Sequence, residues 1–367
     1  MIFYSNKPSV PKTEDYQRLV ESIFDSGFLT NFGQYHNALL EKLKRKLDTK
    51  NIALCNNATT ALACVIRSIS DPKKSDIITT PFTFSATCHS IIWANKKPVF
   101  VDVEDNGFNL CPKAVENAID KNTAAIVPVH CYGIPCNLDK FDDISVRYNI
   151  PIIYDAAHAF GVKYGDKSLV ANGSASVVST HATKAFNTAE GALVYFREDE
   201  KCSQFASMTN FGIDENGETS TLGLNGKLSE LHAALGVANL ETFEKNIEKR
   251  QKLWNHYSTA FRSDDRIQLI ELDSNLRFNF GYCPLTILDD TIRVDRVIAK
   301  LAESKIIARK YFSPILNNTS TFKESKVAGN LKNAKHLNNR VLCLPIHESY
   351  LPHAEFLISE IKRALFK

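Results

Sequence analysis

The feature that most constrains the fold is a series of short apolar runs separated by helical stretches. Most of these runs are hydrophobic at consecutive positions: Asn51–Leu54, Asp76–Thr79, Pro98–Val101, Ala124–Val129, Ile150–Tyr154 and Val177–Ser179. Strands of this kind are typical of a mostly parallel sheet that is covered by helices on both faces. We therefore predict an α/β fold in which residues 1–250 form one large domain.

The chain continues into a long helix and a shorter mixed region. Helical spacing of apolar residues extends from Ser229 to Phe261. The remaining sequence alternates strand-like and helical pieces: Phe278–Leu285, Val294–Ser304, Arg340–Pro345 and Pro352–Phe366. We predict that residues 251–367 form a smaller C-terminal α+β domain.

Composition excludes several classes of protein. The chain has 367 residues, 44% of them hydrophobic, and 44 Lys+Arg nearly balance 41 Asp+Glu. A disordered chain or a nucleic-acid binder would have fewer apolar residues or a larger net charge. The nine cysteines form no disulfide framework, and no run approaches the ~18 apolar residues of a membrane span. We expect a soluble cytoplasmic protein with no nucleic-acid or membrane partner.

The segment IPIIYDAAHAFG has Asp155 at the end of an apolar run and His158 three positions later. Ligands of open α/β sheets bind at the carboxyl ends of the strands, so an acid at this position faces a site. The alternative is that Asp155 only caps the turn or helix that follows it.

A second segment, STHATKAFNTAEG, carries Lys184 between two strand-like runs. A desolvated lysine near other cationic groups can lose its proton and attack carbonyls, whereas the alternative is an ordinary loop lysine. Lys184, Asp155 and the nearby Ser179 match what pyridoxal phosphate requires of a protein: an amine for a Schiff base, an acid for the pyridinium nitrogen and a phosphate ligand.

Two other kinds of enzyme are disfavoured. No G-x-G-x-x-G follows a predicted strand, as a nucleotide-dependent dehydrogenase would require. His130, Cys131 and Cys136 form neither a C-x-x-C pair nor a site with a second half, so we predict no metal.

The chain resembles the DegT/DnrJ/EryC1/StrS family of sugar aminotransferases, which have the aspartate-aminotransferase fold (fold type I). The resemblance extends from Gly27 almost to the C-terminus. It rests on segments that occur in family order: SGFLTNFG, NNATTAL, TPFTFSAT with KPVFVDV, VPVHCYGIPCNLD, IYDAAHAFG, HATKAFNTAEGA, LGLNGKLSELHAALG, RKYFSPI and LCLPIHESY.

The resemblance implies how the cofactor is held. It makes Lys184 the residue that bonds pyridoxal phosphate and moves the proton, and Asp155 the partner of the pyridine nitrogen. His158 is expected near the ring and its 3-hydroxyl. Phe84 matches the aromatic residue that stacks on the cofactor, although by residue type alone it could be a core phenylalanine.

The phosphate is expected to bind at Thr59, Thr60 and Ser179, because NNATTAL begins a helix and helix N-termini favour anions. An ordinary threonine cap is the alternative reading of Thr59 and Thr60. Asn225 matches a family residue that reaches the phosphate of the neighbouring subunit, which implies a homodimer with shared active sites.

The resemblance leaves several alternatives for the substrate. Lys184, which related sugar dehydratases replace with histidine, favours transamination. The implied reaction moves an amino group from L-glutamate to a keto nucleotide sugar, with dTDP-4-dehydro-6-deoxy-D-glucose aminated at C4 as the leading acceptor and a bacterial surface glycan as its destination. Amination of a dTDP-3-dehydro-6-deoxyhexose at C3 and a non-catalytic binding member of the fold are the alternatives. The residues expected to bind substrate are Thr30, Asn187, Glu190, Arg309, Lys310 and Tyr311, although Arg309 and Lys310 also fit a solvated basic pair.

Overall fold

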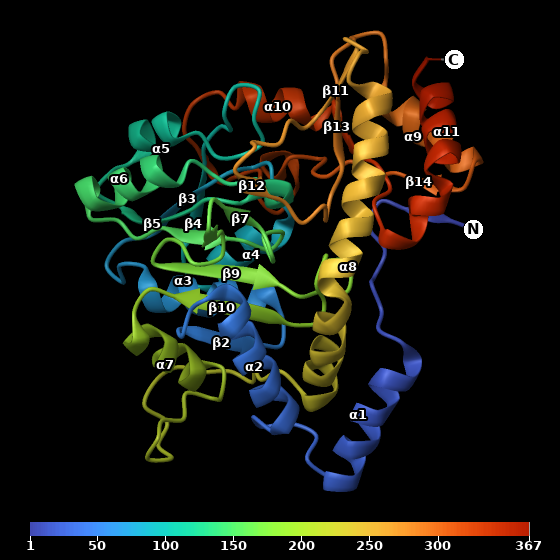
Figure 1. The fold of residues 1–367 in the computed structure, drawn as a ribbon. Coiled ribbons are helices and arrows are strands. Elements are labelled where there is room, and N and C mark those ends of the chain that lie inside the picture. The colour runs from blue at the N-terminus through green and yellow to red at the C-terminus, as the bar shows by residue number, and fades with distance from the viewer. Residues whose placement is uncertain (367) are drawn as a thin grey trace.

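The computed structural model describes residues 1–366, and a central sheet forms its middle layer (Figure 1). Bridges between Ile126 and Ile152 and between Val129 and Asp155 join the two halves of this sheet. The strand order is β2 (Ile52–Cys55), β10 (Ala192–Phe196), β9 (Ala175–Ser179), β6 (Ile153–Asp155), β5 (Thr123–Val127), β3 (Asp76–Thr79), β4 (Lys97–Phe100) and β15 (Lys326–Val327). Neighbours are parallel except at β10, which is antiparallel to β2 and β9. The predicted α/β fold with a mostly parallel sheet is confirmed.

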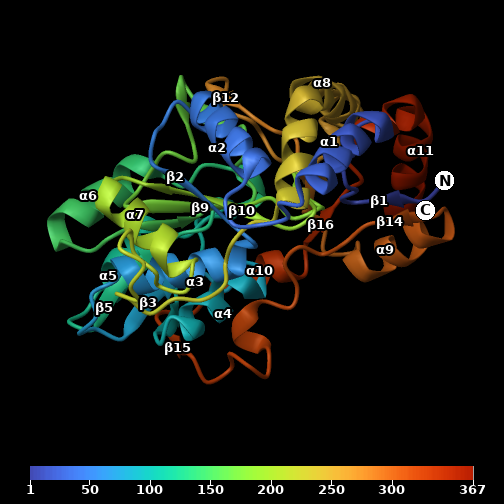
Figure 2. The same cartoon turned by 90° about the horizontal axis from the view of Figure 1, so that it is seen from below.

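Side chains of the central strands alternate between two hydrophobic cores. In β2, Ile52 and Leu54 belong to one core, whereas Ala53 and Cys55 belong to the other. Figure 2 shows α2 and α3 on opposite sides of β2, β9 and β10. The runs are apolar at consecutive positions because helices cover both faces. The covering helices are α2 (Gln34–Leu47) and α8 (Glu230–Phe261) on one face and α3 (Ala58–Ile69) on the other.

Further helices flank the sheet along the first part of the chain. In α1, Gly27 closes the helix with a φ of +66°, a left-handed conformation that glycine adopts without strain. A small separate sheet packs nearby, formed by β7 (Lys163–Tyr164), β8 (Lys167–Ser168) and β12 (Leu276–Arg277). The flanking helices are α1 (Thr13–Ser26), α4 (Ser85–Trp93), α5 (Pro112–Ala118), α6 (Leu138–Tyr148) and α7 (Asp199–Met208).

Helix α8 leads from the sheet into the C-terminal part of the chain. Ser229 caps it by accepting a hydrogen bond from the His232 N–H, and the helix continues unbroken across position 250. The division into domains at that position stays a prediction. The C-terminal part contains β11 (Ile267–Leu269), β13 (Pro284–Ile287), β16 (Val341–Cys343), α9 (Val294–Glu303), α10 (Lys332–Asn338) and α11 (Ala354–Phe366), and β1 (Phe3–Tyr4) pairs with its β14 (Ile306–Ile307).

The prediction of one strand in the C-terminal part of the chain is mostly wrong. Of the run Phe278–Leu285, only the last two residues lie in β13, and the others are irregular. Phe280 has a φ of +48°, which no strand contains, and the side chain of Asn279 binds the backbone carbonyls of His158 and Phe160. The run is apolar because its side chains are buried.

Within residues 1–366, none of the helices combines the length and the hydropathy that crossing a membrane requires.

Candidate active site

A cavity of about 320 Å³ opens at the carboxyl edge of the central sheet. The loops that follow β2, β3, β6 and β9 line it, together with a few residues of the C-terminal part. Parallel strands end at the same edge, so segments far apart in the sequence meet there. The predicted site residues that line the cavity are Thr59, Phe84, Asp155, His158, Ser179, Lys184, Glu190, Arg309 and Tyr311.

Asp155 is the last residue of β6 and is 8% exposed. Its Oδ2 accepts a hydrogen bond from Thr87 Oγ1 at 2.7 Å, and its Oδ1 accepts one from the Ala157 N–H at 3.1 Å. Burial raises the pKa of Asp155, while these two donors and the charge of Lys184 oppose the rise. The cavity therefore contains a buried carboxyl group that a cationic ligand would stabilise in its charged form.

Lys184 lies in the loop between β9 and β10 and lines the cavity. Its Nζ donates a hydrogen bond to the hydroxyl of Tyr282 at 3.0 Å. Burial lowers the pKa of Lys184 to about 8, against the opposing charge of Asp155. A useful fraction of the amine is therefore neutral near pH 7, the form that attacks carbonyls.

His158 is 7% exposed and packs between aromatic rings, 4.3 Å from the ring centre of Tyr282. Its Nδ1 accepts a hydrogen bond from the Tyr132 N–H at 3.0 Å. Burial, and secondly the charge of Lys184, lower the pKa of His158 well below its ordinary value. The ring is therefore neutral, and because Nδ1 is an acceptor, its proton is on Nε2.

The N-terminus of α3 is a candidate anion site. Asn57 caps this helix by accepting a hydrogen bond from the Thr60 N–H at 2.8 Å, and Thr59 faces the cavity. Ser179, at the end of β9, lies on the same cavity wall. Backbone N–H groups at a helix N-terminus and nearby hydroxyls favour a phosphate.

Phe84 is 60% exposed although it lies just before α4 in the cavity wall. The alternative that it is a core residue is therefore wrong. An aromatic face, an anion site, a buried carboxyl group and a lysine of lowered pKa border one cavity. These residues fit pyridoxal phosphate: Asp155 would face the ring nitrogen, Lys184 the aldehyde and Phe84 the ring, and Thr59 and Ser179 would hold the phosphate.

Comparison with known sequences identifies the family. Residues 11–355 match the profile of the DegT/DnrJ/EryC1/StrS aminotransferase family. The chain belongs to this family. It is 34% identical over 361 residues to the dTDP-4-amino-4,6-dideoxy-D-glucose transaminase of Shigella dysenteriae, a match that covers 98% of each chain. The Escherichia coli enzyme of the same name is 34% identical over 348 residues, 93% of this chain and 92% of its own.

Solved structures agree with this assignment. DesI, crystallised in the presence of its TDP-sugar product, has a TM-score of 0.90 and 26% identity, covering 99% of this chain and 93% of its own. The Helicobacter pylori aminotransferase PseC shares the fold with a TM-score of 0.91, 23% identity and coverage of 100% and 99%. This DegT/DnrJ/EryC1/StrS member is therefore a sugar aminotransferase that uses pyridoxal phosphate.

Five of the predicted site residues do not line the cavity. Thr60 borders a separate hollow on the outer side of α3, and its N–H bonds Asn57. Thr30 is exposed before α2. Lys310 pairs with Asp295 at 2.7 Å instead of pointing inward. The remaining two residues, Asn187 and Asn225, also lie outside the cavity, and the partners of their side chains show why.

Asn187 is 2% exposed, and its side chain donates to the backbone carbonyl of Ser9 at 2.9 Å. Asn187 is therefore a buried anchor in this structure and does not line the cavity. Asn225 is exposed, and its Oδ1 accepts a hydrogen bond from Lys227 at 2.8 Å. It lies outside the cavity of its own chain.

The structure also adds residues that sequence reasoning missed. Tyr282 contacts Lys184, Thr87 contacts Asp155, and the Tyr132 N–H contacts His158. Thr87 and Tyr132 lie in the quoted segments TPFTFSAT and VPVHCYGIPCNLD, whereas Tyr282 lies in none of them. The sequence does not reveal these contacts, because each residue meets its partner only through the packing of distant segments. Among residues 1–366, no cluster of three or more His, Cys, Asp and Glu side chains has the arrangement of a metal site.

Proposed function

We propose that the protein transfers an amino group from L-glutamate to C4 of dTDP-4-dehydro-6-deoxy-D-glucose, forming dTDP-4-amino-4,6-dideoxy-D-glucose. The observation that carries this proposal is the 34% identity with the Shigella dysenteriae transaminase of that product over 98% of each chain. The cavity supports it, because Lys184, Asp155 and His158 meet there in protonation states suited to amino transfer.

Pyridoxal phosphate supplies an electron-withdrawing ring that accepts negative charge from the carbon undergoing proton transfer. Asp155 would hold the ring nitrogen in its protonated form, because a buried carboxylate gains most from a neighbouring cation. His158 presents the Nε2–H as a fixed donor.

Lys184 would act as base and acid, moving a proton between the reacting carbon of each substrate in turn and the cofactor. Its pKa of about 8 suits both directions of transfer near neutral pH. The hydroxyl of Tyr282, which burial keeps protonated by raising its pKa, holds the amine at 3.0 Å. The aromatic wall around Tyr282 limits the access of water.

The nucleotide sugar is proposed to enter at the mouth of the cavity. Arg309 Nη1 lies 3.4 Å from the hydroxyl of Tyr311, and a guanidinium beside an aromatic suits a pyrophosphate and a base. Glu190 also lines the cavity, and its Oε1 lies 3.7 Å from His181 Nε2. This pair provides polar groups for sugar hydroxyls.

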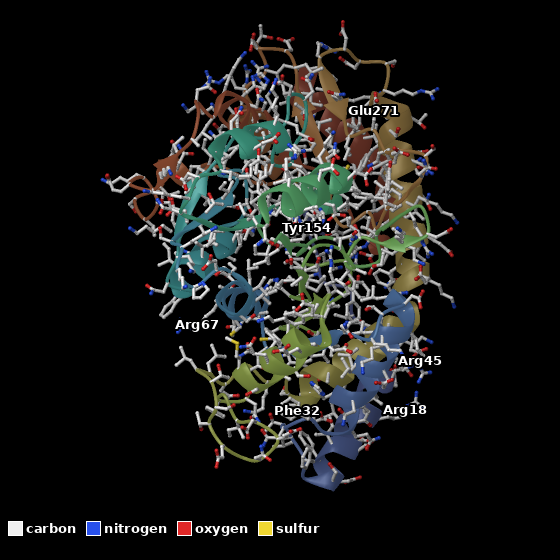
Figure 3. All side chains as sticks on the ribbon, turned by 90° about the vertical axis from the view of Figure 1, so that its left-hand side faces the viewer. Arg18, Phe32, Arg45, Arg67, Tyr154 and Glu271 are labelled. Carbon is white, nitrogen blue, oxygen red and sulfur yellow. The ribbon has the colours of Figure 1, made fainter. Side chains whose placement is uncertain are left out.

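We further propose that the protein works as a homodimer in which Asn225 reaches the neighbouring phosphate site. Exposed apolar side chains flank Asn225 on the same segment: Phe211, Leu222 and Leu224. Phe32 is also exposed, at the end of the molecule where α1 lies (Figure 3). Apolar groups gathered on a surface favour association with a partner.

The test uses purified protein loaded with pyridoxal phosphate. L-Glutamate is expected to bleach its visible absorption, and a subsequent addition of the keto sugar is expected to restore it. NMR of the product is expected to place the amine at C4. An amine at C3 would support the dTDP-3-dehydro-6-deoxyhexose reaction instead, and a loaded protein that no amino donor bleaches would support a non-catalytic binding protein.

A further inference from the structure

The loop that carries Lys184 is attached to distant parts of the chain through Asn187. Asn187 Nδ2 donates to the Ser9 carbonyl at 2.9 Å, and its Oδ1 accepts from the Ala189 N–H at 3.2 Å. The side chain of Asn239, in α8, donates to the Asn187 carbonyl at 2.9 Å. Asn187 therefore links its loop to the N-terminal segment and to α8.

Ser9 is in turn held by a buried ion pair. Arg250 is 1% exposed, and its Nη2 donates to Ser9 Oγ while its Nε donates to Glu348 Oε2, both at 2.9 Å. His347 Nε2 lies 3.0 Å from Glu348 Oε1 and 3.2 Å from the Pro8 carbonyl. The N-terminal segment, the Lys184 loop, α8 and the segment after β16 thus meet in one buried network.

The Arg250–Glu348 ion pair fixes the positions of its neighbours more than it stabilises the fold. Removing two charges from water costs free energy that often cancels their attraction. A guanidinium, however, donates in fixed directions, so Arg250 sets the relative positions of Ser9 and Glu348. Although burial raises it, the pKa of Glu348 is lowered to about 2 by the hydrogen bond from His347 and the charge of Arg250, so the carboxylate stays charged.

Backbone hydrogen bonds carry this restraint from Asn187 to Lys184. The Ala182 N–H donates to the Ala189 carbonyl at 2.6 Å, and the Lys184 N–H donates to the His181 carbonyl at 2.9 Å. These bonds close the loop on itself. A shift of Asn187 would therefore move the backbone of Lys184.

We propose that Asn187 and the Arg250–Glu348 pair are positioning residues for the Lys184 amine, acting in sequence through Ser9. The proposal rests on the proposed role of Lys184. A displacement of about 1 Å at a reacting group can cost on the order of 100-fold in rate. Loss of the network is therefore expected to lower kcat while leaving the KM for the amino donor nearly unchanged.

Hydrogen exchange of the cofactor-free protein tests the restraint without using activity. The variants are Asn187→Ala, the paired Arg250→Met/Glu348→Met, and the combination of all three. Amide exchange in residues 180–191 is expected to rise at least about tenfold in the first two, as local opening becomes easier. The combination is expected to match Asn187→Ala alone, because the ion pair acts through Asn187.

Asp102→Asn is the matched control. It weakens a polar contact that involves no residue of the network, because Asp102 accepts hydrogen bonds from the N–H groups of Asn333 and Ala334 at 2.9 and 2.8 Å. It is expected to leave exchange in residues 180–191 unchanged. If the ion-pair variant does not fold, Ser9→Ala removes only the hydroxyl that Arg250 binds and replaces it in the series.

Unchanged exchange of the loop in Asn187→Ala, or additive effects in the combined variant, would overturn the positioning role. Faster exchange in Asp102→Asn to the same extent would overturn it as well, because the effect would then be general destabilisation. If the exchange results are as expected but L-glutamate does not bleach the loaded protein, the proposed function is contradicted and the positioning role of the network is not.

Discussion

The amine of Lys184 donates a hydrogen bond to the hydroxyl of Tyr282 at 3.0 Å, although 98 positions separate the two residues. Lys184 comes from the loop after β9, and Tyr282 from the irregular segment before β13. The contact joins the edge of the central sheet to the C-terminal part of the chain. The reactive amine is therefore oriented by a residue outside the sheet that carries it.

Replacing Tyr282 with phenylalanine tests this contact. Removing the hydroxyl deletes the partner of a basic amine, a bond worth about 1.5–3 kcal/mol, so amino transfer from glutamate is expected to slow by about 10- to 100-fold. Single-turnover bleaching measures the rate. Tyr311→Phe is the control, because its hydroxyl contacts Arg309 and not Lys184. Equal losses in both variants would contradict a specific role for Tyr282.

The pKa of Lys184 predicts how cofactor capture depends on pH. Burial lowers this pKa to about 8, so the neutral, nucleophilic fraction rises about tenfold per pH unit below that value and levels off above it. Stopped-flow absorbance after mixing cofactor-free protein with pyridoxal phosphate should follow this curve. A rate that continues to rise up to the ordinary lysine pKa would show that burial does not activate the amine.

Asp155→Asn tests whether the negative charge of Asp155, and not only its size, is needed next to the cofactor ring. The amide keeps the size of the carboxyl group but carries no negative charge, so cofactor affinity is expected to fall about 100-fold and amino transfer to fail. Thr87→Val is the companion variant, since it removes the 2.7 Å hydrogen bond to Asp155 together with the 2.9 Å contact with Thr83 Oγ1. Its expected loss of affinity is about tenfold, measured by titration with pyridoxal phosphate.

Asn57→Ala should destabilise the protein even without cofactor. The side chain caps α3 by accepting from the Thr60 N–H at 2.8 Å, and loss of such a cap costs about 1 kcal/mol. Urea unfolding of the cofactor-free protein measures this free energy. Asn57→Ser, which can also cap a helix, should recover most of the loss, whereas equal instability of both variants would argue against the capping role.

Shared active sites predict complementation between two inactive variants. Lys184→Ala and Asn225→Ala should each be impaired, because one lacks the reactive amine and the other lacks the proposed phosphate contact across the dimer. Mixed dimers would contain one intact site, so an equimolar mixture should regain about a quarter of wild-type activity after exchange of subunits. No recovery, with mixed dimers verified by mass spectrometry, would show that Asn225 does not act across the interface.

Much of the fold could be read from the sequence because it depends on local pattern. Consecutive apolar residues such as Ile52–Leu54 predict a strand covered on both faces, and this is what α2 and α3 provide. The same rule failed at Phe278–Leu285, where burial is equally complete but the φ of Phe280 and the contacts of Asn279 exclude a strand. Apolar composition reports burial and not backbone conformation.

The residues of the candidate site also differ in how far the sequence predicts them. Asp155 and Lys184 were identifiable from the sequence, because Asp155 ends a buried strand, Lys184 follows another, and both belong to family segments whose chemistry needs an acid and an amine. Only the tertiary structure decided that Asn187, three residues beyond Lys184, turns away from the cavity to bind Ser9. A polar side chain in a loop follows the hydrogen-bond partner that folding brings to it, and here that partner lies 178 positions away.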